Sequence, residues 1–188
     1  MSVFADVRDR STLAKRMAQK ARPKFLFFWG HQPSADASVT KSCFSQWYAA
    51  SFSVDGMLYR TAEHFMMAEK ARLFGDQAIH ERVLSASTPA QAKRLGRMVE
   101  GFKDETWLRE RFEIVVRANC EKFSQNKALG QFLLDTGDRV LVEASPVDAI
   151  WGIGLAADHP DADRPHRWPG LNLLGFALME VRQTLAKT

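Results

Sequence analysis

The stretch YRTAEHFMMAEKA, residues Tyr59 to Ala71, decides the fold of this chain. Before it, the pair Asp55-Gly56 predicts a tight hairpin between residues 52–54 and 57–59, because Gly accepts the positive φ that such turns need. Thr61 is a good N-cap for a following helix, since its hydroxyl can accept a hydrogen bond from an N–H group of the first turn. The stretch therefore predicts a strand that runs directly into a helix.

Two charged residues fall on a largely apolar face of this helix. Glu63, Met67 and Lys70 follow one another at spacings of four and three, so they share one face. The spacing alone favours an ordinary Glu–Lys surface pair, worth about 0.2–0.5 kcal/mol. The alternative is that the carboxylate and the ammonium line a site, because such groups are unusual on a face used purely for packing.

Composition limits the class of protein. The 188 residues are 46% hydrophobic and 26% charged, which predicts one globular domain with a sizeable core. Two cysteines far apart in sequence fit a reducing compartment, and neither a membrane span nor a signal peptide is expected. We therefore expect a cytoplasmic protein. The net charge of +4 permits anionic substrates such as phosphates but does not require nucleic acid.

The remaining pattern predicts a mainly α-helical, single compact domain over residues 23–188. A few short strands are expected in the N-terminal third, including 25–29, and around 140–144. Capping residues and glycines predict further helices over 76–86, 88–101, 104–124, 126–134 and 173–186. In the longest of these, Leu108 and Phe123 belong to one inward stripe.

Residues 1–22 form a basic segment that precedes this domain and has helical character. The favoured interpretation is a solvated, partly ordered leader. The alternative is an arm that steers a substrate or a nucleic acid toward the protein.

Several motifs occur in an order that resembles the YbiA-like, or NADAR, superfamily. The first is Tyr59-x-Thr61-x-Glu63-His64-x-Met66-Met67-x-x-Lys70-Ala71. The later ones are Trp107 after an acidic pair, Lys122 to Asn126, Leu134 to Gly137, Val142 to Ser145, Asp148 to Gly154, and Trp168 to Gly175. Together they extend from about Phe25 to Leu185, and the resemblance implies a YbiA-like helical domain over that range.

The resemblance also implies an activity, which is cleavage of an N-glycosidic bond to ribose. The implied substrates are phosphoribosylamino-pyrimidine intermediates of riboflavin synthesis, from which ribose 5-phosphate would be released. One alternative is removal of ADP-ribose from guanine in nucleic acid, the only case in which a nucleic acid would be a partner. Another is a non-catalytic module that binds ADP-ribose or an NAD derivative.

Cleavage of such a bond passes through a ribosyl cation that a carboxylate can stabilise, and a carboxylate can also take a proton from the attacking water. By the family match, Glu63 is the first catalytic candidate and Asp148 the second. Without the resemblance, a turn or cap carboxylate is an equally good interpretation of Asp148. Glu143 ends an apolar strand, where a charge is costly unless it is paired or functional.

The other candidates would bind the substrate. Arg60 and Lys70 are the phosphate candidates, although Arg60 could simply be exposed. Trp107 and Trp151 are candidates for stacking on the base, with core packing as the alternative. The family match carries over Phe44, Trp47 and Tyr48 as pocket residues.

Asn172 either caps the last helix or orders a loop over the pocket. Lys122 and Asn126 contribute polar contacts or cap a helix end, and His64 is expected to be packed. His159 and His166 lie among aspartates without the spacing of a metal motif, and no phosphate-loop or dinucleotide fingerprint occurs. We therefore expect neither a metal nor a cofactor.

Overall fold

The computed structural model describes residue 4, residues 6–19 and residues 22–187. The chain divides into two compact units. Unit 1 comprises residues 1–45 and 128–188, and unit 2 comprises residues 46–127. Helices predominate in both units, which confirms the mainly α-helical class.

Unit 2 begins with the expected hairpin. Strands β2 (Phe52–Val54) and β3 (Met57–Tyr59) pair antiparallel. Both turn residues have positive φ, 51° at Asp55 and 79° at Gly56, as the turn of a two-residue hairpin requires. Helix α2 (Ala62–Leu73) follows at once, and the Thr61 hydroxyl accepts a hydrogen bond from the N–H of His64, which confirms the predicted cap.

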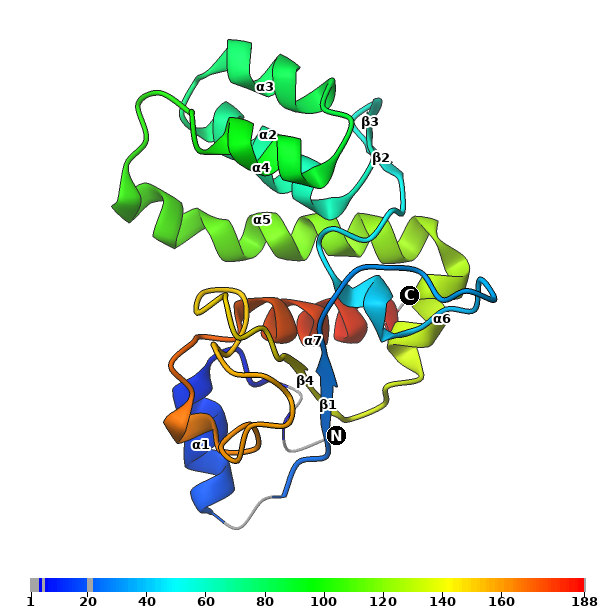
Figure 1. The fold of residues 1–188 in the computed structure, drawn as a ribbon, viewed down its shortest axis with the longest axis vertical. Helices are drawn as coiled ribbons and strands as arrows, with labels where there is room; N and C mark the ends of the chain where they lie inside the picture. The colour runs from blue at the N-terminus through cyan, green and yellow to red at the C-terminus, as the bar shows by residue number, and fades with distance from the viewer. Residues whose placement is uncertain (1–3, 5, 20–21, 188) are drawn as a thin grey trace. The chain divides into compact units, whose positions relative to one another are not determined.

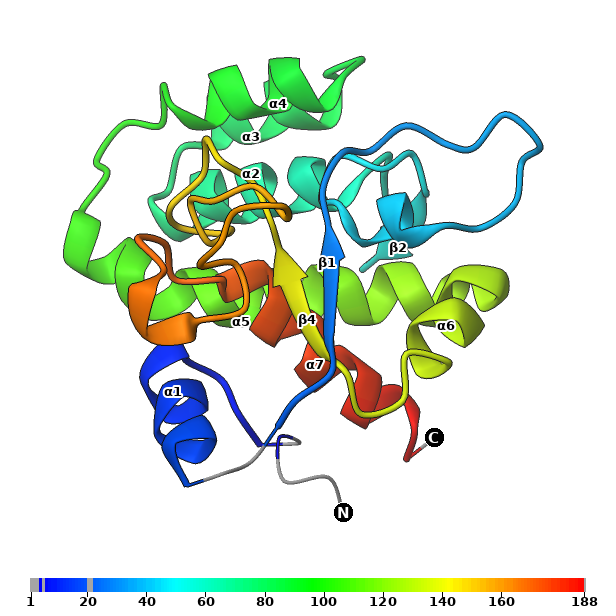
Figure 2. The same cartoon turned by 60° about the horizontal axis from the view of Figure 1, so that its bottom comes forward.

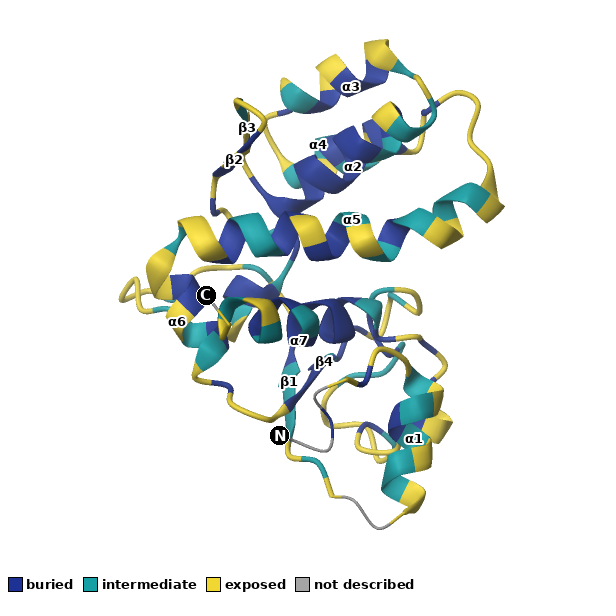
Figure 3. Cartoon of the chain, turned by 180° about the vertical axis from the view of Figure 1, so that it is seen from behind, coloured by how far each residue is buried: buried dark blue, intermediate teal, exposed yellow. Residues whose placement is uncertain are grey.

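Helix α2 is the centre of unit 2. It packs against α3 (Gln77–Leu84), α4 (Pro89–Gly96) and α5 (Asp104–Gln125), as Figure 1 shows. Most of α2 is buried and is drawn in nearly unbroken dark blue in Figure 3. A Cβ added at Gly96 of α4 would overlap the thioether of Met67, so the glycine permits the close approach of the two helices.

The first turns of α5 depart from the predicted inward stripe. Phe123 is 1% exposed, as predicted, but Leu108 is 56% exposed. The stripe is therefore wrong at its N-terminal end. Helical spacing predicts which residues share a face, whereas the length of helix that is covered depends on neighbours far away in sequence.

Unit 1 is built on a parallel pair of strands. β1 (Phe25–Phe28) pairs with β4 (Val140–Glu143), and α7 (Leu173–Leu185) packs against β4, as Figure 2 shows. Strands were predicted at both places, but their pairing was not. A Cβ at Gly175 would overlap the carbonyl oxygen of Leu141, so this glycine brings the helix against the strand.

The remaining short helices are α6 (Lys127–Leu134) and two 3₁₀ helices, η1 (Lys41–Phe44) and η2 (Pro165–Arg167). Residues between β4 and α7 are otherwise irregular, as predicted. No helix in the described part of the chain is long and apolar enough to cross a membrane.

The basic N-terminal segment contains helix α1 (Arg10–Ala18), which contacts η2 within unit 1. Val7 is 1% exposed and Leu13 is fully buried. The expectation of a solvated leader is therefore wrong for these residues, because their apolar side chains pack into unit 1. The domain boundary expected after residue 22 stays a prediction.

Candidate functional site

The predicted site residues fall into two groups, one in each unit. Unit 2 contains Trp47, Tyr48, Arg60, Glu63, Lys70 and Trp107. Unit 1 contains Phe44, Glu143, Asp148, Trp151 and Asn172.

Glu63 lies in the first turn of α2 and is 3% exposed. Its backbone N–H donates to the carbonyl oxygen of Gln46 at 3.0 Å, which fixes the start of the helix against the segment that precedes the hairpin. The partial positive charge at a helix N-terminus favours an ionised carboxylate there. The surface Glu–Lys pair is therefore wrong, since Glu63 is buried.

A buried polar group adjoins this anchor point. Gln46 is 6% exposed, and its side-chain oxygen accepts a hydrogen bond from the Asn119 amide of α5 at 2.8 Å. Trp47 and Tyr48 follow directly in sequence and are half-buried. Segment 46–48 therefore presents two partly accessible aromatic rings next to the residue that holds Glu63.

Lys122 is a candidate that sequence reasoning undervalued. It lies in α5 and is fully buried, with its ammonium 5.7 Å from the Tyr48 ring centroid and 5.0 Å from that of Phe123. Burying a lysine is expensive unless it is paired or neutralised, so such a position is often functional. The available signal was its place at the head of a family motif, whereas proximity to a helix end suggested only a cap.

Lys70 and Trp107 are brought together by the structure. The Lys70 ammonium donates to the carbonyl oxygen of Gly96 at 2.8 Å, and it lies 4.2 Å from the Phe102 ring centroid and 5.5 Å from that of Trp107. Burial lowers the pKa of Lys70, while the nearby Asp104 carboxylate opposes that change. The lysine therefore ties the start of α5 to α4, and Trp107 is half-buried beside it.

His64 is packed, as predicted, and Arg60 is exposed. One ring nitrogen of His64, Nε2, lies 3.1 Å from the carbonyl oxygen of Ala86, and Nδ1 lies 2.8 Å from the Thr61 hydroxyl. Because a carbonyl can only accept, Nε2 carries the proton and Nδ1 accepts from the hydroxyl. Burial lowers the pKa of His64, and the Arg60 charge adds to that effect, so the ring is held neutral.

In unit 1, Asp148 caps its own loop. One carboxylate oxygen, Oδ1, accepts hydrogen bonds from the N–H groups of Ile150 and Trp151, both at 2.8 Å. The Asp148 carbonyl oxygen accepts from the Gly154 N–H at 3.1 Å. The turn role considered from the sequence is therefore present. The side chain is half-buried, and its second oxygen, Oδ2, is not needed for these contacts.

Asn172 has a different role from the one expected. It is fully buried with φ 57°, and its side chain does not cap α7. Its amide donates to the carbonyl oxygen of Leu141 at 3.0 Å and accepts from the N–H of Glu143 at 2.9 Å. These are the two bonds that a neighbouring parallel strand would make to β4. Both ends of the amide are thus used by the strand, and substrate binding by Asn172 stays a prediction.

The N-terminus of α7 is also occupied. The backbone N–H groups of residues 171–174 donate to carbonyl oxygens of residues 149–152. These groups would otherwise form a ready anion site. The loop that contains Asp148 and Trp151 instead satisfies them, and it is thereby fixed against the helix and next to Glu143, which is half-buried.

Phe44 belongs to the core of unit 1. It is fully buried, and its ring centroid lies 5.4 Å from that of Phe28 and 5.5 Å from that of Phe132. Its ring therefore contributes to packing in this structure, and its assignment as a pocket residue stays a prediction.

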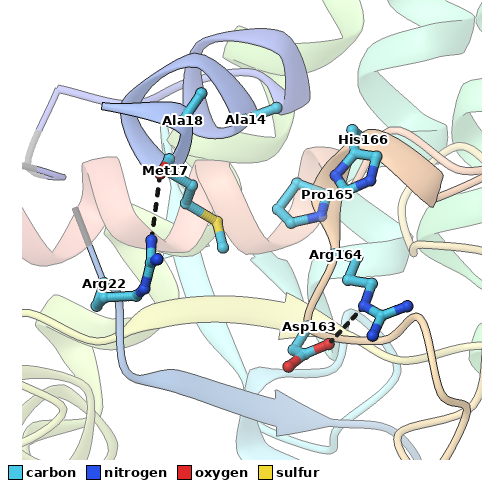
Figure 4. A pocket seen from close by; sticks show the side chains of 8 residues that line it. All are labelled: Ala14, Met17, Ala18, Arg22, Asp163, Arg164, Pro165 and His166. Carbon is cyan, nitrogen blue, oxygen red and sulfur yellow. Dashed lines mark hydrogen bonds and ion pairs between the residues drawn. The ribbon is translucent and has the colours of Figure 1, made fainter. Parts of the chain in front are cut away.

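A cavity of about 290 Å³ lies between α1 and η2 in unit 1, as Figure 4 shows. Its lining residues are Ala14, Met17, Ala18, Arg22, Asp163, Arg164, Pro165 and His166. No predicted site residue belongs to this lining. Among the described residues, no group of His, Cys, Asp and Glu is placed to hold a metal ion.

Comparison with known proteins identifies the family of this chain. A model of the NADAR domain matches residues 27–186. The chain therefore belongs to the NADAR family. This one match covers most of unit 1 and all of unit 2.

The chain is similar to three named proteins. It is 42% identical over 165 residues to an N-glycosidase of Acanthamoeba polyphaga mimivirus, covering 85% of this chain and 95% of that protein. It is 33% identical over 143 residues to N-glycosidase YbiA of Escherichia coli strain K12, covering 76% and 81%. It is 37% identical over 141 residues to a riboflavin biosynthesis protein of Vibrio vulnificus, covering 75% of this chain but 35% of that protein.

The fold also resembles a solved structure. The NMR structure of E. coli YbiA superimposes with a TM-score of 0.66 at 29% identity, and the match covers 89% of this chain and 88% of that chain.

Proposed function

We propose that this protein is an N-glycosidase, a hydrolase that cleaves the bond between ribose and a nitrogen of a heterocycle. Two relatives that match most of their own length are named N-glycosidases, and one of them is 42% identical. The structural observation that carries the proposal is the buried Glu63 in the first turn of α2. The positive end of the helix dipole favours a carboxylate in that position, and such a carboxylate would stabilise a developing cation.

Glu63 would stabilise the ribosyl cation as the glycosidic bond breaks. Asp148 would take a proton from the attacking water through Oδ2, because Oδ1 is occupied by two N–H groups of its loop. The heterocycle leaves with the electron pair of the broken bond and a proton, and the ribose gains the hydroxyl from water.

The other residues would bind the substrate. Trp107, Trp47 and Tyr48 are half-buried and present rings on which a flat heterocycle can stack. Exposed Arg60 would bind the phosphate. An ammonium has three N–H donors, so Lys70 would also bind the phosphate while it keeps its contact with Gly96. Trp151 and Glu143, which both belong to unit 1, stay candidates for substrate binding.

We propose phosphoribosylamino-pyrimidine intermediates of riboflavin synthesis as the substrates. The relative named as a riboflavin biosynthesis protein supports this choice, although this chain spans about a third of that protein. The modest net charge of +4 suits a small phosphorylated metabolite. A cytoplasmic location, where such metabolites are made, is part of the same proposal.

The test is a product assay on the purified protein with two substrates in parallel. One reaction contains the phosphoribosylamino-pyrimidine, and the other contains DNA with ADP-ribosylated guanine. Release of ribose 5-phosphate in the first supports the proposal. Release of ADP-ribose in the second reaction alone would identify ADP-ribosylated guanine as the substrate instead. Tight ADP-ribose binding without turnover in either reaction would make the protein a binding module.

The variant Glu63→Gln keeps the size of the side chain and removes its charge, so turnover should fall by about 100-fold or more while the fold is kept. Glu69→Gln is the matched control, because Glu69 is a second buried carboxylate of α2 that pairs with Arg72 at 2.7 Å. We expect this control to lose some stability and keep its turnover. Normal activity of Glu63→Gln would exclude Glu63 from the reaction.

A further inference from the structure

Helix α1 precedes the segment that matches the family, yet it holds part of that segment. The half-buried Arg10 guanidinium donates through Nη1 to the carbonyl oxygen of Trp168, and it reaches the carbonyl oxygen of Gly170 at 3.4 Å. Trp168 is itself buried, and its indole N–H donates to the carbonyl oxygen of Ala162 at 2.8 Å. One cation of α1 therefore connects to the chain segment 168–170 through backbone carbonyls.

Segment 168–170 in turn lies directly on the loop that contains Asp148. The Gly170 N–H donates to the carbonyl oxygen of Ile153 at 2.8 Å. A Cβ added at Gly170 would overlap the carbonyl oxygen of Gly152, and one at Gly154 would lie 2.8 Å from the Pro169 ring. Because the two backbones touch without intervening side chains, a displacement of one must displace the other.

The same loop positions the candidate catalytic carboxylate. The N–H groups of Ile150 and Trp151 hold Oδ1 of Asp148, and the Gly154 N–H holds its carbonyl oxygen. A continuous path of short contacts therefore runs from Arg10 through Gly170 to Asp148. Every contact of the path lies within unit 1.

The rest of the interface between α1 and this region is less tightly packed. Ala14, Met17 and Ala18 on the C-terminal half of α1 line the cavity of about 290 Å³ together with residues 163–166, as Figure 4 shows. Arg8, two residues before α1, pairs with Glu180 of α7 at 2.9 Å, which gives this segment a second contact that does not touch the loop.

We propose that Arg10 is a positioning residue for the reaction, acting through the backbone of residues 168–170 to hold the loop of Asp148 in its working geometry. This inference rests on the proposed function. In this role, α1 supports the site without touching the substrate.

The experiment compares Arg10→Met with Lys15→Ala in the full chain. Lys15 is exposed on the same helix, so its loss removes one charge from α1 without removing a contact to the loop. We expect Arg10→Met to lower kcat about 10- to 100-fold with little change in KM, because small misplacements of a catalytic group cost rate in that range. Lys15→Ala should keep both constants, and Arg10→Lys should recover part of kcat.

Amide hydrogen exchange, measured by NMR without substrate, tests the physical link separately. Arg10→Met should speed exchange at the hydrogen-bonded amides of Ile150, Trp151, Ile153, Gly154 and Gly170, while the amides of α7 beyond its first turn stay protected. Unchanged exchange at these residues would overturn the proposal, as would faster exchange with an unchanged kcat. An inactive wild-type protein would refute the proposed function instead, and the exchange result would still decide whether Arg10 holds the loop.

Discussion

Replacing Asn172 tests whether a side chain takes the place of a missing strand beside β4. In Asn172→Asp, one oxygen can still accept from the N–H of Glu143, but the other faces the carbonyl oxygen of Leu141, which the amide contacted at 3.0 Å. Two acceptors then face each other in a fully buried place. Leaving the carbonyl without a donor should cost about 1–3 kcal/mol of unfolding free energy.

The same substitution should make stability depend on pH in a definite direction. A buried carboxyl beside a carbonyl oxygen is more stable protonated, so its folded-state pKa is raised above the unfolded value. The folded state then holds a proton that the unfolded state releases as pH rises. The loss of stability relative to the wild type should therefore be larger at pH 8 than at pH 5.

Asn172→Gly is the companion variant. Glycine accepts the φ of 57° without strain, so this change removes both amide contacts without adding backbone strain. Together with the unfolded-state entropy that glycine adds, we expect a cost of about 2–6 kcal/mol. Urea unfolding at both pH values, followed by circular dichroism, measures all three proteins. If both variants unfold within about 0.5 kcal/mol of the wild type at each pH, the amide does not support the strand.

Three further predictions concern unit 2. Because the pKa of His64 is lowered in the folded state, the unfolded chain takes up a proton first as pH falls through about 6.5, so unfolding free energy should drop there by up to about 1.4 kcal/mol per pH unit. This dependence should weaken in His64→Gln, and an unchanged pH profile would contradict the assignment. Gly96→Ala should destabilise the protein by about 1–3 kcal/mol in thermal unfolding through overlap with Met67, and adding Met67→Ala should relieve part of the loss. Trp107→Ala should raise KM in the product assay with little change in Tm, whereas a large fall in Tm would make its ring part of the core.

Much of unit 2 could be predicted because its rules are local. The Asp55-Gly56 turn needs only two residues that accept positive φ, and the Thr61 cap needs only a free N–H within the next few residues. The strands were also found, because β-rich apolar runs are visible in sequence. The parallel pairing of β1 with β4 could not be predicted, since it depends on contacts between one segment that precedes unit 2 in the sequence and one that follows it.

The structural roles of several candidate site residues could not be predicted, for a common physical reason. An asparagine or a phenylalanine suits a ligand site as well as it suits a buried structural position. Only the contacts seen in the structure show the structural roles of Asn172 and Phe44. The burial of Glu63 and Lys122 could not be predicted from spacing, because spacing identifies a helix face but not what covers it. Both residues belong to the family motifs, and only Glu63 was assigned a catalytic role from them.

The order in which the chain leaves the ribosome gives the parallel strand pair a consequence for folding. β1 is synthesised early, but its partner β4 and the covering helix α7 follow only after all of unit 2. Unit 2 is continuous in sequence, so we expect its hairpin and helices to form while synthesis proceeds. Until β4 has been synthesised, the Phe-rich β1 has an unpaired edge that can pair with strands of other chains. A nascent or truncated chain that lacks β4 should therefore need a chaperone, even though its middle part can fold.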